Sequence, residues 1–213
     1  YGAAVKEDRQ SVVEGASVMT SVDLGRRWGI KNRDQVRCYN GNRRRKRSGD
    51  QPEDYAADVK WMMEQPEGFF MIKQGISFHS PMKDVIPDFH YGMTQKKAGY
   101  HGAMDQGQIS EHGMAHMLDC VAAMKEVSGD KVSLALDCGP GWFLNDAIRF
   151  ARAVEKYNLM WLEDMLTGDY VPWVNPQAYR ELTTSTSTPI HTGEQIYLRH
   201  NFKELIETQA VRV

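Results

Sequence analysis

Three acidic residues, Asp137, Glu163 and Glu194, each stand at or just after a short apolar run of the sequence. They are separated by 26 and 31 residues, and each interval is about the length of one helix plus one strand. If the three carboxylates met in space they would repel one another, and their pKa values would rise unless a cation neutralised them. Ligation by oxygen alone, with room for water, suits Mg²⁺ better than Zn²⁺. The spacing therefore predicts a magnesium site, provided that the fold brings the three run ends together.

The elements around these acids predict such a fold. Apolar runs predict strands at residues 36–39, 69–72, 133–136, 160–162, 189–192 and 211–213. Helical patterns lie between the runs and no hairpin signal is present, so the order favours a parallel α/β sheet. Neither a GxGxxG motif nor a P-loop occurs, which favours a partial TIM-like (β/α) barrel over a doubly wound sheet. In a barrel the carboxyl ends of all strands lie on one face, where the three acids would converge.

Local signals place several other residues. Asn175 before a proline, and Asn201 with an acid three residues later, each predict the start of a helix. His116 lies in a Met-rich helical pattern, so we expect it to pack against the core. His191 is out of phase with Glu194 along an extended strand, which predicts that its side chain faces the helices rather than the substrate.

The composition is that of an ordinary globular protein. The chain has 213 residues, of which 41% are apolar and 25% charged, and its formal net charge is −2. These values exclude disordered, collagenous and disulfide-knotted chains, and they give no basic field that would favour nucleic acid. No apolar stretch is long enough to span a membrane. Three widely spaced cysteines indicate reduced thiols, so we expect a cytoplasmic protein without nucleic-acid or membrane partners.

Residues 76–112 fit neither the strand nor the helix period and are too long for an ordinary connection, so they predict a lid or insertion. The segment holds His79, His90, His101 and His112. These histidines are candidates for acid–base chemistry, and a polar lid with surface histidines is an equally good interpretation of each one. A basic run at residues 43–47 predicts a solvated loop by default, or a loop that attracts an anionic substrate on the catalytic face.

The sequences around the three acids resemble the metal-binding strands of the enolase superfamily. The matching motifs are LDCGPGW at residues 136–142, WLED at 161–164 and TGE at 192–194. The resemblance is closest to the mandelate racemase/muconate lactonizing enzyme branch and its acid-sugar dehydratases, from about residue 15 to the end. It implies a modified barrel, represented at residues 36–213 by five βα units and the start of a sixth strand. Residues 1–35 would be the tail and linker of an N-terminal capping domain.

The resemblance also assigns roles to residues. Asp137, Glu163 and Glu194 match the ligands of one essential Mg²⁺, and the neighbouring Asp164 matches a residue that supports the ligands. Lys73 matches the first lysine of the Lys-x-Lys that ends the second strand in the family, which implies a catalytic role in which it holds the substrate carboxylate or lowers a neighbour's pKa. An exposed lysine at a strand end is the alternative.

Two positions depart from the family's pattern. Gly75 stands in place of the second lysine, which speaks against a racemase that uses a lysine base. Gly139 stands where some sugar-acid dehydratases have a histidine proton donor, so the acid would have to come from elsewhere.

The implied activity is that of a Mg²⁺-dependent dehydratase of a sugar acid, an aldonate or aldarate. Such an enzyme abstracts the proton α to the carboxylate, forms a metal-stabilised enediolate, and eliminates the β-hydroxyl to give a 2-keto-3-deoxy acid. A racemase or epimerase on a similar carboxylate, and a truncated barrel without catalysis, are the alternatives. The family's base and closing carboxylate lie on strands six to eight, so we expect this chain alone to be inactive. We expect the full-length protein to form a homo-oligomer.

Overall fold

The computed structural model describes residues 38–41, 45, 49–91, 107–166, 175–194 and 196–212. The predicted capping-domain tail at residues 1–35 lies outside these residues. So do most of the basic run and residues 92–106 of the insertion, with His101.

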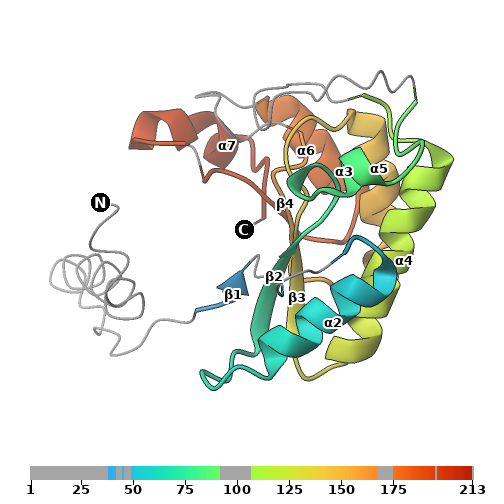
Figure 1. Ribbon diagram of the computed structural model, residues 1–213. Coiled ribbons are helices and arrows are strands. Elements are labelled where there is room, and N and C mark those ends of the chain that lie inside the picture. The colour runs from blue at the N-terminus through green and yellow to red at the C-terminus, as the bar shows by residue number, and fades with distance from the viewer. Residues whose placement is uncertain are drawn as a thin grey trace, which may run out of the picture. The chain divides into compact units, whose positions relative to one another are not determined.

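Five parallel strands form one sheet and follow one another in chain order. They are β1 (Asn40–Gly41), β2 (Met71–Gly75), β3 (Ser133–Asp137), β4 (Leu162–Glu163) and β5 (Ile190–His191). Each neighbouring pair is parallel, so every connection crosses over (Figure 1). The predicted α/β fold is therefore confirmed, and an order without reversal is that of a barrel wall rather than of a doubly wound sheet.

The described residues form six α-helices. They are α2 (Pro52–Met63), α3 (Met82–Val85), α4 (Glu111–Ser128), α5 (Leu144–Ala153), α6 (Pro176–Ser185) and α7 (Lys203–Glu207). Helices α2 and α4 pack together on the same side of β2 and β3 (Figure 1). Ile72, Leu134 and Leu136 belong to the buried apolar core between sheet and helices. Since side chains alternate along a strand, the residues between them face away from these helices.

Two predicted helix starts have different outcomes. Asn175 caps α6 as predicted, because its Oδ1 accepts a hydrogen bond from the Ala178 N–H at 3.0 Å. The prediction at Asn201 is wrong. Its side-chain amide donates to the Tyr197 carbonyl inside the 3-10 turn Arg199–Phe202, and α7 begins only after that turn. Asn201 lies within that turn, and Phe202 is the residue that caps α7.

The two ends of the sheet also differ from the predicted runs. The first strand, Asn40–Gly41, lies after the apolar run at residues 36–39. No sixth strand is assigned among the residues that the structure describes. However, the Arg212 N–H donates to the Ile190 carbonyl at 3.2 Å, so the chain returns beside β5, where a sixth strand would pair.

The described flanks of the insertion are packed rather than loose. The segment after β2 forms the 3-10 turn Ser77–His79 and the short helix α3, and His90 pairs with Ile109 in an isolated antiparallel bridge. Phe78, Phe89 and Ile109 are almost fully buried. These contacts anchor both sides of the segment to the core.

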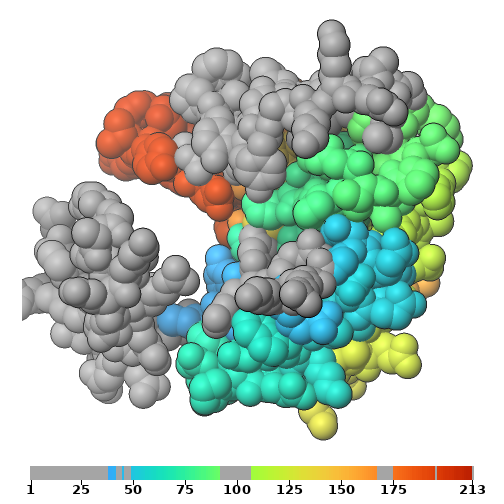
Figure 2. Space-filling model, in the orientation of Figure 1, coloured from blue at the N-terminus to red at the C-terminus, as the bar shows by residue number. Residues whose placement is uncertain are grey.

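The C-terminal helix contributes exposed apolar surface. Figure 2 shows α7 and the turn before it as an orange-red projection at one side of the molecule. Leu198 and Ile206 are 70% and 68% exposed there. Among the helices of the described ranges, none is long and apolar enough to cross a membrane.

Candidate active site

One row of residues crosses the sheet at the carboxyl ends of four strands. The strand register pairs Gly75 with Asp137, Asp137 with Glu163, and Glu163 with His191. Register partners on adjacent parallel strands face the same side of a sheet. The carboxylates of Asp137 and Glu163 therefore lie side by side, on the face that turns away from α2 and α4. Of the three acids predicted to converge, Asp137 and Glu163 meet through this register.

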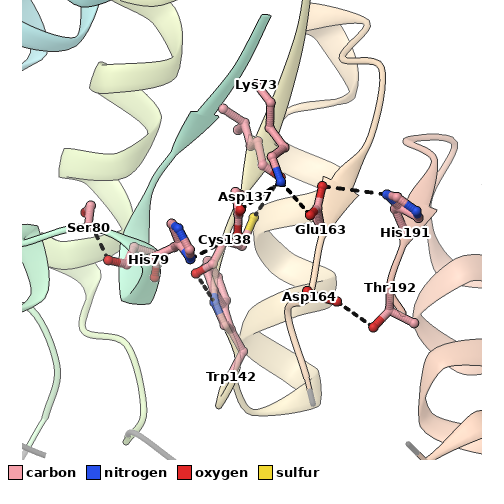
Figure 3. Close-up of polar contacts among 12 residues, drawn as sticks. Lys73, His79, Ser80, Asp137, Cys138, Trp142, Glu163, Asp164, His191 and Thr192 are labelled. Atoms are coloured by element: carbon pink, nitrogen blue, oxygen red, sulfur yellow. Dashed lines mark hydrogen bonds and ion pairs between the residues drawn. The ribbon is translucent and has the colours of Figure 1, made fainter. Parts of the chain in front are cut away.

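Lys73 reaches this row from two residues earlier on β2, as expected from its position. Its Nζ lies 2.6 Å from Glu163 Oε1 and 3.0 Å from Asp137 Oδ2, as Figure 3 shows. Its own register partners are Gly41 and Ala135, whose small size leaves the path of the lysine side chain clear. Lys73 is only 6% exposed, so its ammonium forms a buried bridge between two carboxylates.

The pKa values of the bridged groups depend on one another. Burial alone would lower the pKa of Lys73, but the charges of Asp137 and Glu163 outweigh it and raise that pKa well above its ordinary value. Burial would raise the pKa of Glu163, but contacts with His191, Lys73 and Trp161 hold it at about 2. At neutral pH both members of the Lys73–Glu163 pair are therefore charged.

Trp161 is a site residue that the sequence interpretation missed. Its Nε1 donates to Glu163 Oε2 at 2.8 Å, and its ring stands edge-on to that of Tyr39, with centroids 5.7 Å apart. Trp161 precedes Glu163 by two residues, the spacing that places two strand residues on one face. This spacing is enough to predict from the sequence that Trp161 lies beside Glu163 at the site.

His191 also faces the site, so the prediction that it turns toward the helices is wrong. Its Nδ1 lies 3.6 Å from Glu163 Oε2, and its ring packs edge-on against Trp161 at 5.5 Å. The phase argument assumes an extended chain from His191 to Glu194. Strand β5 ends at His191, and Gly193 has a φ of +122°, which side-chain-bearing residues rarely adopt. The chain turns there, and the alternation stops.

A second group of acids adjoins the first. Glu163, Asp164 and Glu194 each offer an oxygen, and these oxygens all lie within 4.8 Å of one another. Consecutive strand residues point to opposite faces, but Asp164 has a φ of +54°, which takes the chain out of the strand conformation. Thr192 Oγ1 donates to Asp164 Oδ1 at 2.6 Å and holds that carboxylate in place (Figure 3). Glu163 thus belongs both to this group and to the row that it forms with Asp137 and His191.

His79 is a histidine of the insertion that reaches these acids. Its Nδ1 lies 3.2 Å from Asp137 Oδ1, and its side chain is 21% exposed. By contrast, the ring of His90 packs against Phe89, and burial lowers its pKa. His112 donates from Nδ1 to a backbone carbonyl at 3.0 Å.

The surroundings of Gly139 explain why a histidine does not stand two residues after Asp137. Its φ is +67°, and a Cβ built on it would lie 2.6 Å from the backbone nitrogen of His79 and 2.8 Å from the carbonyl carbon of Phe78. The two loops therefore touch through their backbones, and a side chain at position 139 has no room. The imidazole beside Asp137 comes from the β2 side instead.

Two further predictions can be compared with the structure. His116 is 9% exposed and donates from Nε2 to the Asp50 carbonyl at 2.8 Å, which confirms its packing role. Arg45, the one described residue of the basic run, is not simply solvated. Its Nε donates to Asp58 Oδ1 at 2.8 Å, and that carboxylate is fully buried.

Comparisons with known proteins agree with this geometry. The sequence model of the enolase C-terminal domain-like family matches residues 89–213, more than half of the chain. D-xylonate dehydratase of Haloferax volcanii is 36% identical over 98 residues, which are 46% of this chain and 23% of that protein. L-talarate/galactarate dehydratase of Salmonella typhimurium is 25% identical over 128 residues, 60% of this chain and 30% of that protein. The chain thus spans less than a third of the length of these two curated relatives.

Solved structures show the same partial coverage. A mandelate racemase/muconate lactonizing enzyme-like protein from Rubrobacter xylanophilus superposes with a TM-score of 0.64 and 30% identity, over 88% of this chain and 45% of that one. An enolase-superfamily member from Salmonella typhimurium gives a TM-score of 0.60 at 18% identity, over 82% of this chain and 41% of that one. The second likeness is one of fold alone. Both are consistent with a sheet that forms part of a larger barrel.

Proposed function

Because the chain belongs to the enolase C-terminal domain-like family, we propose that it is part of a Mg²⁺-dependent dehydratase that acts on an aldonate or aldarate sugar acid. The family membership confirms the resemblance to the enolase superfamily. The observation that carries the proposal is the placement of Asp137 and Glu163 on either side of Lys73, next to the group formed by Glu163, Asp164 and Glu194. Relatives named as sugar-acid dehydratases support the choice of reaction.

The residues fit a divalent cation. The donors are carboxylate oxygens alone, which hard cations such as Mg²⁺ prefer, and the ammonium of Lys73 already sits among them as a positive charge. We propose Asp137, Glu163 and Glu194 as ligands, with Asp164 supporting them from the Thr192 side. Oxygens of Glu163, Asp164 and Glu194 lie within 4.8 Å of one another, and Asp137 is the register neighbour of Glu163. When bound, Mg²⁺ supplies a Lewis acid that makes the proton α to a substrate carboxylate easier to remove.

Lys73 is proposed to bind the substrate carboxylate rather than to act as the base. In the metal-free site the charges of Asp137 and Glu163 raise the pKa of Lys73 and keep its ammonium charged, and a charged ammonium has no lone pair with which to accept a proton. Gly75, two residues later on the same face of β2, offers no second amine. This arrangement disfavours a racemase that uses a lysine of β2 as base.

Two histidines border the same space and are proposed to contact substrate hydroxyls. His79 stands beside Asp137, and His191 stands beside Glu163 with its side chain 34% exposed. An imidazole nitrogen can donate to or accept from a hydroxyl group. Such contacts would orient a polyhydroxy acid over the carboxylates.

The test is incubation of the full-length protein that contains this chain with a panel of aldonic and aldaric acids, followed by detection of 2-keto-3-deoxy acids. We expect keto product that disappears with EDTA and returns with Mg²⁺. Lys73→Gln should abolish product, whereas Lys83→Gln, which alters a lysine with the same 6% exposure on α3, should retain it. Exchange of the α-proton with solvent deuterium but no keto product would favour an epimerase and contradict the proposal.

A further inference from the structure

Lys73 lies between two oxygens that a cation shared by Asp137 and Glu163 would use, because the other oxygen of each carboxylate already contacts His79 or Trp161. Its Nζ is 3.0 Å from Asp137 Oδ2 and 2.6 Å from Glu163 Oε1. A Mg²⁺ ion binds oxygen at about 2.0–2.1 Å, so an ion bound to both oxygens would come within the same narrow space between them. One position cannot hold an ammonium and a divalent ion together.

Burial makes this conflict strong. Lys73, Asp137 and Glu163 are 6%, 3% and 4% exposed, so water does little to screen charges placed among them. Repulsion between an ammonium and a divalent cation a few ångströms apart is therefore large. The lysine has to leave Asp137 Oδ2 and Glu163 Oε1 if the metal binds these two oxygens.

The structure also offers the lysine somewhere to go. Its Nζ lies 5.7 Å from the centroid of the Tyr39 ring, a distance at which a cation is attracted to an aromatic face. Tyr39 is 44% exposed, so movement in this direction carries the ammonium toward solvent and toward an incoming anion.

We propose that Lys73 is the built-in counter-cation of the metal-free site, and that a divalent cation displaces its ammonium from Asp137 and Glu163 and so frees it to bind the substrate carboxylate. Metal then binds before substrate. This inference rests on the proposed function, because it takes Asp137 and Glu163 to be metal ligands.

The first experiment is calorimetric titration of the metal-free 213-residue chain with Mg²⁺, for the wild type, Lys73→Met and the matched control Lys83→Met. Removing an internal competitor should tighten Mg²⁺ binding by about tenfold or more, while the control should bind like the wild type. Mg²⁺ should also raise the melting temperature of Lys73→Met by more than that of the wild type.

The second experiment uses the wild type alone and so does not depend on the folding of a variant. Acetic anhydride labelling, read by peptide mass spectrometry, should modify Lys73 slowly in EDTA and several-fold faster in saturating Mg²⁺. Lys83 in the same sample should label at the same rate in both conditions.

The outcomes separate the two proposals. Mg²⁺ binding by the wild type, with no tightening in Lys73→Met or no change in Lys73 labelling, would overturn the counter-cation role and leave the metal site standing. Absence of Mg²⁺ binding by the wild type would overturn both.

Discussion

Replacing Glu163 by Gln in the metal-free protein should reveal how strongly the site depends on that one charge. The carboxylate is held by Lys73 at 2.6 Å, Trp161 at 2.8 Å and His191 at 3.6 Å. Together these partners lower its pKa from 4.5 to about 2. Glutamine keeps the shape of the side chain but removes the charge that Lys73 pairs with.

The expected loss follows from the pKa shift. One pKa unit corresponds to about 1.4 kcal/mol, so the charge of Glu163 contributes about 3 kcal/mol to the free energy of unfolding at pH 7. Because the folded pKa is depressed, this contribution is complete above the unfolded pKa and is lost as the pH falls through the folded pKa. At pH 3 about 1.5 kcal/mol should remain, since the unfolded carboxyl is then almost wholly protonated while the folded one is mostly charged.

The assay is urea denaturation in EDTA, followed by tryptophan fluorescence, at pH 7 and at pH 3. Glu163→Gln should be less stable than the wild type by about 3 kcal/mol at pH 7 and by about half of that at pH 3. Glu181→Gln, which changes an exposed glutamate on α6, should stay within about 0.5 kcal/mol of the wild type. A difference below about 1 kcal/mol at pH 7, or an equal difference at both pH values, would refute the reasoning.

Two further substitutions test the backbone and the support of the site by thermal or urea denaturation. Gly139→Ala should cost about 3 kcal/mol or more, because a Cβ there meets the backbone of His79 and Phe78. Gly68→Ala, with a similar φ of +66° and nothing within 4 Å, should cost only about 1 kcal/mol, and equal losses would contradict the steric account. Thr192→Val should cost about 2 kcal/mol and weaken Mg²⁺ binding, because it removes the donor to the buried Asp164 carboxylate. Thr184→Val, which alters an exposed hydroxyl bonded to its own helix, should change stability by less than about 0.5 kcal/mol, and similar losses for both threonines would argue against a role for Thr192 at the site.

Much of the fold could be predicted because its signals are local. Strand-length apolar runs that alternate with helical patterns require parallel crossovers, and parallel strands must end on one edge. Asp137 and Glu163 therefore meet whatever the details of the loops, and Lys73 joins them because it lies on the same face of β2. The core role of His116 follows from helical periodicity in the same way.

The failures occur where the backbone leaves a regular conformation. His191 was assigned to the wrong face because Gly193, at a φ of +122°, ends the alternation that the argument used. Asp164 joins Glu163 and Glu194 because its φ is +54°, and no periodic pattern encodes such a residue. The capping prediction at Asn201 is wrong because this residue lies within a 3-10 turn, and α7 begins two residues later.

By itself, the sequence determined the order of elements, the parallel sheet and the acids at its carboxyl edge, because these depend on periodicity along a single chain. Only the tertiary structure decided which groups contact those acids. Lys73 and Glu163 are separated by 90 residues, and His79 belongs to the 3-10 turn after β2 whereas Asp137 ends β3. Their pairing depends on strand register and on the close approach of two loops at Gly139, which are properties of distant segments packed together. Charge neutralisation in the metal-free site is therefore a product of packing rather than of motif.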